Sequence, residues 1–384
     1  MHIAMISEPA DVADLAAALA EQGHDVRIYT RRDDPDVAEV VITPSGVHVV
    51  HIEAGPVRPV PSDLLLPYMG ELARILGEQW RDGWAPDVVH AHFWTSGLAA
   101  VTAAKQLNIP VVQSFHELGE SEETAQGPSR TGYERALGRA VDRVVAQTQE
   151  EMRGLVRIGV PRARLTVVPP GVDSERFTPD GPAVQRDPER PRILSVGKLV
   201  ERKGFGDVIQ AMRYVPGAEV VVIGGPPPEQ LQADPGARLL RSMAEQFKVA
   251  DRFRLVGSVP QRDMPSWYRS ADVLVATPWE EQAALEAMAC GVPIVGPASG
   301  ALTETVVDGL TGDLVPARDP RALGSAMRRL VNDKVRRFTY ATAALDRARQ
   351  AYSWRRVASQ IGSVYTSLRR TPAVSTPAVA EDAV

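Results

Sequence analysis

Cysteine is nearly absent, since Cys290 is the only one among 384 residues. A single cysteine excludes an intramolecular disulfide framework and any cysteine-rich zinc site, and it fits a reducing compartment. We therefore expect the protein to be cytoplasmic. We interpret Cys290 as a small core side chain rather than a nucleophile, because no histidine is its neighbour in the sequence.

Long apolar runs and a strong charge excess are missing as well. No stretch approaches the length needed to cross a bilayer, and the N-terminus runs into a strand-like segment without the features of a signal peptide. The 43 Lys and Arg residues stand against 48 Asp and Glu residues, a net charge of −5, which disfavours nucleic acid as the main partner. There is also no Gly-x-Ser-x-Gly, no Walker loop and no strand followed by Gly-x-Gly-x-x-Gly, so hydrolase, P-loop and dinucleotide interpretations lack support.

Short β-rich runs alternate with helical patterns along most of the chain. The predicted strands are 2–6, 26–30, 47–52, 88–92, 111–115, 144–147 and 165–168 in the first half, and 193–196, 220–223, 253–256, 273–276 and 293–295 in the second. Strands separated by helices need crossover connections, so each sheet should be parallel and covered on both faces. The chain is longer than one core usually organises, which predicts two domains.

A segment rich in Pro, Gly, Asp and Arg lies between the two halves and predicts a linker. We expect an N-terminal domain over 1–172, a linker over 173–191 and a C-terminal domain over 192–350. A last helix over 351–370 should return to the N-terminal domain, and the small, polar, Pro-punctuated tail 371–384 should be disordered.

Cations follow a strand of the second half, at the end where open parallel sheets bind ligands. The strand ends at Val196, and the Gly197 turn is followed by Lys198 and Lys203. Lysines next to free backbone amides suit a phosphate site. A solvated basic turn is an equal alternative from spacing alone. After the next strand, the pair 224–225 of glycines allows close backbone approach or only a tight turn.

Three carboxylates gather where a short helix over 283–289 is predicted to begin: Glu280, Glu281 and Glu286. An ionised carboxylate can accept hydrogen bonds from two neighbouring sugar hydroxyls. The alternative is that glutamates in a first helical turn only complement the helix dipole.

Histidines end two strands of the first half. His90 and His92 share one strand face and could form half of a metal site, but no third ligand is near, so hydrogen-bonding roles are favoured. His116 ends the next strand and is the better candidate for a functional histidine.

Together, the segments VVPPGVDSERFTP, ILSVGKLVERKGF, VVIGGP, LVGSVPQRDMPSWYRSADVLVATP and LEAMACGVPIVG resemble the retaining family 4 glycosyltransferases. In the first half, HAHFWTSGLAA and SFHELG are similar to the sucrose-phosphate-synthase-like and inositol-phosphate-glycosylating branch. The resemblance implies the GT-B fold, two Rossmann-like doubly wound parallel-sheet domains facing across a cleft. It further implies that the C-terminal domain binds a nucleotide sugar, that the N-terminal domain holds the acceptor, and that no metal is needed.

The resemblance also assigns roles to residues. Lys203 matches the diphosphate-binding lysine, and Lys198 stands where the family usually has an arginine, which keeps the charge but loses the bidentate fork. Glu286 matches the glutamate that accepts from the ribose hydroxyls, and His116 matches the histidine beside the transferred sugar. Gly257 lies in the segment that usually holds the base. Glu280 or Glu281 would hold the sugar, and a UDP-sugar is the favoured donor, with no cofactor.

Three departures from the family leave two functions open. The glycine-rich loop after the first strand is absent from MISEPADVADL, the Phe-Gly expected between Glu280 and Glu286 is missing, and the segment after SFHELG is acidic. One hypothesis is a working retaining glycosyltransferase with a small polar acceptor. The alternative is a non-catalytic or impaired GT-B protein that binds nucleotide, a protein partner or a second copy of itself. A GT-B sugar-nucleotide epimerase is a third, for which no acid and base carboxylates can be identified.

Overall fold

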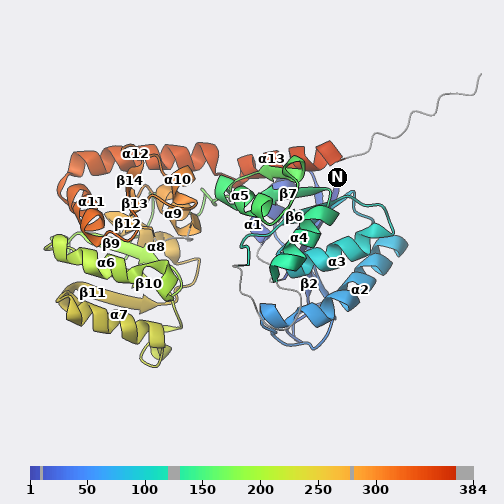
Figure 1. Cartoon of the computed structure of the whole chain (residues 1–384), viewed down its shortest axis with the longest axis horizontal. Coiled ribbons are helices and arrows are strands. Elements are labelled where there is room, and N and C mark those ends of the chain that lie inside the picture. Colours follow the sequence, from blue (N-terminus) through green and yellow to red (C-terminus); the bar gives the residue numbers. More distant parts are fainter. Residues whose placement is uncertain (9–11, 120–129, 277–280, 369–384) are drawn as a thin grey trace, which may run out of the picture. The chain divides into compact units, whose positions relative to one another are not determined.

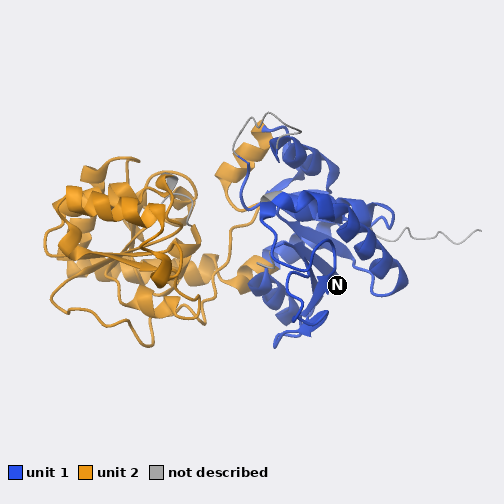
Figure 2. Cartoon of the chain, turned by 90° about the horizontal axis from the view of Figure 1, so that it is seen from below, with its two compact units in different colours: residues 1–145, 158–166, 359–384 blue, residues 146–157, 167–358 orange. Residues whose placement is uncertain are grey.

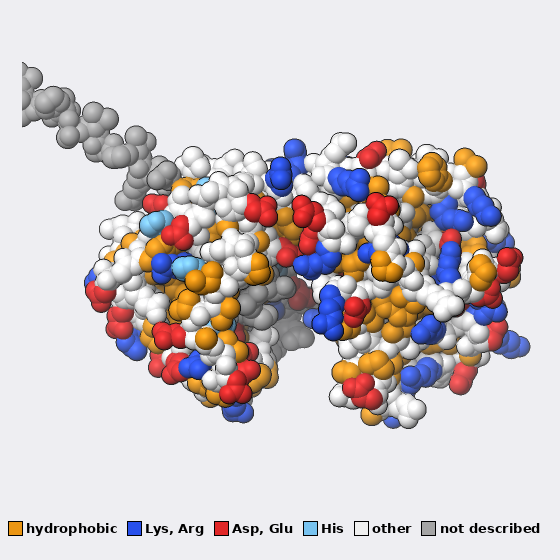
Figure 3. All heavy atoms as spheres, turned by 180° about the vertical axis from the view of Figure 1, so that it is seen from behind, with side chains coloured by type: hydrophobic (Ala, Val, Ile, Leu, Met, Phe, Trp, Pro, Cys, Tyr) orange, Lys and Arg blue, Asp and Glu red, His pale blue; other side chains and the backbone are white. Residues whose placement is uncertain are grey.

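The computed structural model describes residues 1–8, 12–119, 130–276 and 281–368 (Figure 1). The chain divides into two compact units (Figure 2): unit 1 comprises 1–145, 158–166 and the chain from 359, and unit 2 comprises 146–157 and 167–358. Among the described helices, none is long and apolar enough to cross a membrane. On the face shown in Figure 3, acidic and basic side chains are interspersed with apolar ones, as the small net charge of −5 suggests.

Unit 1 is built on an eight-stranded sheet with the strand order β3-β4-β2-β1-β5-β6-β7-β8. The strands are β1 (His2–Ser7), β2 (Asp25–Arg31), β3 (Val40–Ile42), β4 (His48–Ile52), β5 (Val88–His92), β6 (Val111–Ser114), β7 (Arg143–Ala146) and β8 (Leu165–Val167). The pairs from β4 to β7 are parallel, as predicted. The edge strand β3 was not predicted and pairs antiparallel with β4. Its three residues are too few for a periodic pattern, and all three are exposed.

The helices around this sheet include α1 (Ala13–Glu21), α2 (Met69–Asp82), α3 (Trp94–Lys105), α4 (Arg130–Ala140) and α13 (Trp354–Leu368), which unit 1 includes from residue 359 onward. Leu72, Leu76 and Trp80 are buried along one side of α2, at the spacing of an amphipathic helix. α1 ends two residues before Gly23, whose φ of 84° suits a glycine just after a helix. Short 3-10 turns lie at Ser62–Leu64, Leu66–Tyr68 and Arg162–Arg164.

Unit 2 is built on a six-stranded sheet, all parallel, with the order β11-β10-β9-β12-β13-β14. The strands are β9 (Arg192–Val196), β10 (Glu219–Ile223), β11 (Phe253–Gly257), β12 (Val273–Val275), β13 (Ile294–Pro297) and β14 (Gly312–Val315). The helices are α5 (Gln149–Arg157), α6 (Phe205–Ala211), α7 (Pro235–Gln246), α8 (Met264–Arg269), α9 (Glu281–Ala289), α10 (Leu302–Thr305), α11 (Pro320–Asn332) and α12 (Lys334–Ala351). Further 3-10 turns lie at Glu201–Lys203, Met212–Tyr214, Pro228–Gln230 and Ala250–Arg252.

Both faces of the unit 2 sheet are covered. Leu194 and Leu274 belong to one hydrophobic cluster, whereas Ile193 and Val273 belong to another. Successive residues of a strand point to opposite faces, so each strand contributes to both clusters. Cys290 is buried in the first cluster, and burial raises the pKa of its thiol to about 12. The prediction of a packed rather than nucleophilic cysteine fits this environment.

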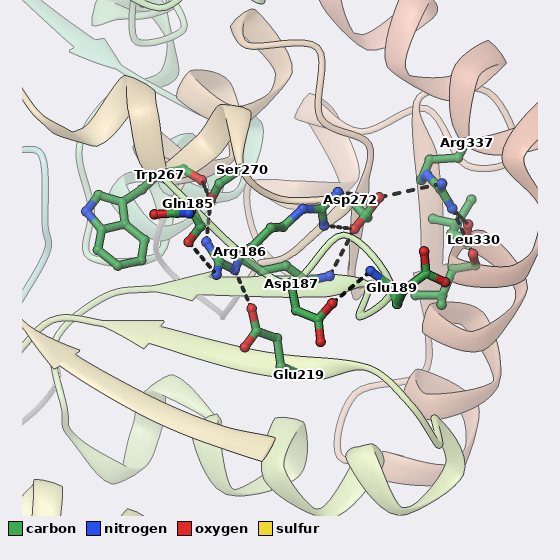
Figure 4. Close-up of polar contacts among 12 residues, drawn as sticks. Gln185, Arg186, Asp187, Glu189, Glu219, Trp267, Ser270, Asp272, Leu330 and Arg337 are labelled. Carbon is green, nitrogen blue, oxygen red and sulfur yellow. Dashed lines mark hydrogen bonds and ion pairs between the residues drawn. The ribbon is translucent and has the colours of Figure 1, made fainter. Parts of the chain in front are cut away.

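The segment 173–191, predicted as a linker, packs on unit 2. Phe177 is buried in that unit's core, and Arg186 forms an ion pair with Asp272. Asp272 also accepts a hydrogen bond of 2.9 Å from the backbone of Arg192. Its carboxylate faces Arg337 (Figure 4), at a distance of 3.5 Å. Arg192 in turn reaches Glu219 at 2.6 Å. These contacts lie where strands of the sheet begin, at the edge opposite the one where ligands of such sheets bind.

Candidate active site

The strand order locates the ligand-binding edge of each unit. In a doubly wound sheet, ligands bind beyond the carboxyl ends of the two strands where the strand order reverses. In unit 1 these strands are β1 and β5, where Ser7 pairs with His92. In unit 2 they are β9 and β12, whose last residues are Val196 and Val275.

Three glycines pack together beyond β9, β10 and β11. The amide of Gly197 donates to Ile223 at 3.0 Å, and the amide of Gly224 donates to the carbonyl of Gly257 at 2.9 Å. Gly224 has a φ of 144°, and a Cβ built on it would lie 1.8 Å from the carbonyl oxygen of Gly197. Gly224, at which the sequence left close backbone approach and a tight turn both open, is therefore required for the close approach of these loops.

The two predicted lysines lie in different environments. Lys198 follows Gly197 directly and is exposed. Lys203 ends the 3-10 turn at Glu201–Lys203 and is only 4% exposed. A buried ammonium group requires interaction partners, and Lys203 has contacts within the folded chain. The chain therefore has one exposed and one buried lysine after β9.

Glu286, on α9, is a buried carboxylate held by neutral donors. Its Oε2 accepts a hydrogen bond of 2.8 Å from the Tyr268 hydroxyl, and its Oε1 accepts one of 2.6 Å from the Gln261 side chain. Burial raises the pKa of Glu286, while these hydrogen bonds lower it. A carboxylate has about four acceptor positions, so this one retains capacity for ligand hydroxyls. Tyr268 and Gln261 were not predicted as site residues, because both lie in the loop and helix after β11, far from α9 in the chain.

Glu281 is the first residue of α9, not part of the preceding loop as predicted. The Thr305 hydroxyl donates to its carboxylate at 2.7 Å. Burial and, to a smaller extent, the nearby charge of Glu304 together raise the pKa of Glu281 to about 7, against the opposing effect of the Thr305 hydrogen bond. The third predicted carboxylate, Glu280, lies outside the described residues.

Unit 1 brings three histidines into one cluster beyond β5 and β6. The Nδ1 atom of His92 lies 2.9 Å from Nε2 of His116, and their rings are stacked with centroids 5.1 Å apart. His90 lies against His92, with ring centroids 4.2 Å apart, and is hydrogen-bonded to Tyr365 at 2.6 Å and to Ser114 at 2.9 Å. The favoured reading of His90 and His92 as hydrogen-bonding groups agrees with these contacts.

The histidine cluster is uncharged at neutral pH. Burial lowers the pKa of His90 to about 3 and that of His116 to about 4. Burial also lowers the pKa of His92 well below its usual value, and the neighbouring histidines lower it further. The side chain of His92 is nearly fully buried, and its Nε2 atom has no hydrogen-bond partner among the described residues. Within the described ranges, no group of three His, Cys, Asp or Glu side chains could hold a metal ion.

Comparison with known protein families gives matches in both halves of the chain. Residues 10–171 match the model of the glycosyl transferase 4-like domain, and residues 190–333 match that of the glycosyl transferases group 1. A D-inositol 3-phosphate glycosyltransferase of Xylanimonas cellulosilytica is 35% identical, over 94% of this chain and 92% of the relative. D-inositol 3-phosphate glycosyltransferase 1 of Catenulispora acidiphila is 32% identical, over 93% of this chain and 89% of the relative.

Solved structures share the same architecture. Sucrose-phosphate synthase from Thermosynechococcus elongatus superposes with a TM-score of 0.83 at 25% identity, covering 96% of this chain and 99% of that one. Anabaena HepE in complex with UDP and glucose gives a TM-score of 0.74 at 16% identity, covering 96% of this chain and 100% of that one, a likeness in fold alone.

The two doubly wound sheets and the likeness to sucrose-phosphate synthase show that the chain has the GT-B fold of glycosyltransferases. The chain belongs to the family 4-like glycosyltransferases, which confirms the resemblance seen in the sequence.

Proposed function

We propose that the protein transfers a sugar from a nucleoside diphosphate sugar to a small polar acceptor with retention of anomeric configuration. The observation that carries the proposal is the burial of one basic and one acidic side chain in unit 2, where Lys203 and Glu286 are each 4% exposed. Lys203 follows β9 and Glu286 lies on the helix that follows β12, so the two residues flank the switch point. A cation suits a diphosphate and a carboxylate suits the ribose hydroxyls of the same nucleotide.

In this reaction the acceptor hydroxyl attacks the anomeric carbon on the face that the diphosphate leaves. The carbon–oxygen bond to the diphosphate breaks, the new glycosidic bond forms, and a diphosphate oxygen takes the hydroxyl proton. Lys203 and Lys198 stabilise the charge that develops on the leaving diphosphate, which is where a fixed cation lowers the barrier. Glu281 orients the transferred sugar, and the neutral imidazole of His116 hydrogen-bonds to it. The reaction needs no metal and no cofactor.

The donor is proposed to be a UDP-sugar, and the site of action the cytoplasm. The names of the relatives make a phosphorylated cyclitol one candidate acceptor. The non-catalytic alternative predicts nucleotide binding without transfer.

The test begins with calorimetric titration of the protein with UDP, GDP and ADP, followed by the matching nucleotide sugars. Lys203→Met should weaken binding of the preferred diphosphate at least tenfold and lower turnover more strongly. Lys334→Met, at an exposed lysine of α12, is the matched control and should change neither. Unchanged affinity and turnover in a folded Lys203→Met protein would exclude the assigned role. Diphosphate binding without preference for a sugar form, and without transfer, would favour the non-catalytic alternative.

A further inference from the structure

We propose that the acceptor of this glycosyltransferase carries no phosphate and is a neutral polyhydroxylated molecule, bound at the switch point of unit 1 with Glu8 as a specificity-determining residue. This inference rests on the proposed transfer reaction and goes beyond it, because it excludes the phosphorylated cyclitol considered above.

Glu8 lies at the ligand-binding edge of unit 1. It is the residue directly after β1, and the last residue of that strand, Ser7, pairs with His92 at the end of β5. The strand order reverses between these two strands. A ligand at this switch point therefore meets Glu8 from one strand and the histidine cluster from the other.

The Glu8 side chain is fixed in place by β2. Its Oε2 atom accepts hydrogen bonds from the Thr30 hydroxyl at 2.9 Å and from the Arg31 amide at 2.8 Å. Its Oε1 atom accepts no hydrogen bond from the described residues and lies 3.7 Å from Nε of Arg31. Glu8 is 8% exposed, so one oxygen of a positioned carboxylate is left to accept from a hydroxyl.

The arginine beside Glu8, Arg31, is held by contacts within the protein. The side chain of Arg31 is fully buried, and its guanidinium donates to the carbonyls of Pro56 at 2.6 Å and Arg58 at 2.8 Å. It cannot turn toward a ligand without breaking these contacts and leaving two carbonyls and Glu8 without their partner.

Near the end of β6, the described groups include a paired arginine and two uncharged histidines. Arg130, on α4, pairs with the buried Glu134 at 2.8 Å and donates to the carbonyl of Glu117. The histidine beside β1, His92, is uncharged, as is His116, whose pKa burial lowers to about 4.

A phosphate monoester carries close to two negative charges and needs charge-assisted donors to replace its lost hydration. The fixed carboxylate of Glu8 repels a phosphate, and the neighbouring arginines already have partners within the protein. A phosphate bound here would therefore lose its hydration without compensation. Hydroxyl groups are favoured instead, because they can donate a hydrogen bond to Oε1 of Glu8 and can accept from or donate to neutral imidazoles. The structure thus matches a polyol better than its phosphate.

The experiment compares matched pairs of acceptors with the donor identified by titration. The pairs are inositol and inositol 3-phosphate, glucose and glucose 6-phosphate, and fructose and fructose 6-phosphate. We expect the neutral member of the productive pair to have a kcat/KM at least tenfold higher. An equal or higher kcat/KM for the phosphorylated member would overturn the inference.

Binding provides a second measurement if none of these pairs turns over. Calorimetric titration of the UDP-saturated protein should show tighter binding of a neutral member than of its phosphate, and binding of no neutral member would overturn the inference. Absence of any nucleotide binding would instead contradict the proposed function, so the two failures are distinguishable.

The variant Glu8→Gln keeps an amide oxygen for Thr30 and for the Arg31 amide but removes the charge. It should lower the preference for the neutral member at least fivefold. The matched control is Glu53→Gln, since Glu53 pairs with the neighbouring Arg32 at 2.6 Å but its side chain is 62% exposed. This control should leave the preference for the neutral acceptor unchanged. An unchanged preference in Glu8→Gln would show that Glu8 does not determine the specificity.

Discussion

Tyr268 and Glu286 form a hydrogen bond of 2.8 Å between a buried phenol and a buried carboxylate. The two residues lie on different helices, α8 and α9, so this bond fixes the carboxylate relative to the loop after β11. In the proposed donor site, the loop holds the base and the carboxylate holds the ribose. The hydrogen bond therefore fixes the distance between the two protein groups that bind the base and the ribose of one nucleotide.

Replacing Tyr268 by phenylalanine should weaken nucleotide binding. The loss of one donor to a buried carboxylate costs about 1–3 kcal/mol of stability, and we expect UDP affinity to fall about tenfold because Glu286 loses its orientation. Tyr340→Phe is the matched control, since the Tyr340 hydroxyl donates to Asp313 at 3.1 Å elsewhere in unit 2. Calorimetric titration with UDP checks the prediction, and equal affinities for the two variants would contradict it.

The glycine packing at Gly224 predicts a contrast between two alanine variants. Gly224→Ala places a methyl group 1.8 Å from the backbone oxygen of Gly197, so the loops after β9 and β10 must separate. Gly217 also has a positive φ, of 82°, but a Cβ there meets nothing within 4 Å. Gly217→Ala should therefore cost about 1 kcal/mol of stability from backbone strain alone, with UDP affinity retained.

Gly224→Ala should lose more stability and at least tenfold in UDP affinity. Urea unfolding and UDP titration of the two proteins test the contrast. If Gly224→Ala binds UDP as tightly as Gly217→Ala does, the loops beyond β9 and β10 are not part of the donor site.

His116 should make the protein less stable in acid. Its pKa is about 4 in the folded protein, below the ordinary value of 6.5 for histidine. The unfolded chain therefore binds more protons between these values, and the contribution to the free energy of unfolding is lost as the pH falls from about 6.5 to about 4. His116→Asn removes this effect and suits the φ of 62° at this position, because asparagine tolerates the left-handed region.

The measurement is urea unfolding of wild type and His116→Asn at pH 7.5 and pH 5. Relative to wild type, His116→Asn should gain roughly 2 kcal/mol between pH 7.5 and pH 5. A difference between the proteins that does not change with pH would show that His116 titrates normally.

Glu281 should make the protein less stable at alkaline pH, the opposite of the effect of His116. Its pKa of about 7 in the folded protein exceeds the ordinary value of 4.5, so the folded chain binds more protons between these values. The contribution is fully present below about pH 4.5 and is lost as the pH rises through about 7. Glu281→Gln, whose amide oxygen can still accept from Thr305, should therefore be more stable than wild type at pH 8 by on the order of 3 kcal/mol. At pH 4.5 the two proteins should unfold at nearly the same urea concentration, and a constant difference would contradict the raised pKa.

Asp272 should be important for stability but not for nucleotide binding. It joins Arg186, Arg337 and the backbone of Arg192 at the edge where the strands of unit 2 begin (Figure 4). Asp272→Ala leaves partly buried guanidinium groups without a counter-charge, which costs about 3–5 kcal/mol. The exposed pair of Arg74 and Glu78 is the control, and Glu78→Ala should cost less than about 0.5 kcal/mol.

Urea unfolding of the Asp272 and Glu78 variants gives the two stability losses, and UDP titration below the unfolding range of Asp272→Ala should give wild-type affinity. Weaker UDP binding in that protein while folded would show that the network at the start of the strands influences the opposite edge.

Local pattern predicted much of the fold, because apolar runs and helical spacing follow from which faces a strand or helix must bury. The run at 88–92 predicts β5 without error, and Gly197 falls at the turn after β9 as expected. The pattern failed at β3, which buries none of its side chains, and at 173–191, where a loop-like composition conceals contacts with unit 2 such as the ion pair of Arg186.

The sequence by itself determined the family, the two doubly wound sheets and the residue types available at their binding edges, because these depend on short-range pattern and on motifs read along the chain. Only the tertiary structure decided what those residues are free to do. Lys198 and Lys203 look alike in the sequence, but one is exposed and the other buried. Glu8 received no role until the pairing of β1 with β2 brought it to the Arg31 amide. The protonation state, the hydrogen-bond partners and the exposure of each side chain depend on neighbours that are distant in sequence. These neighbours are brought together only by the packing of the folded chain.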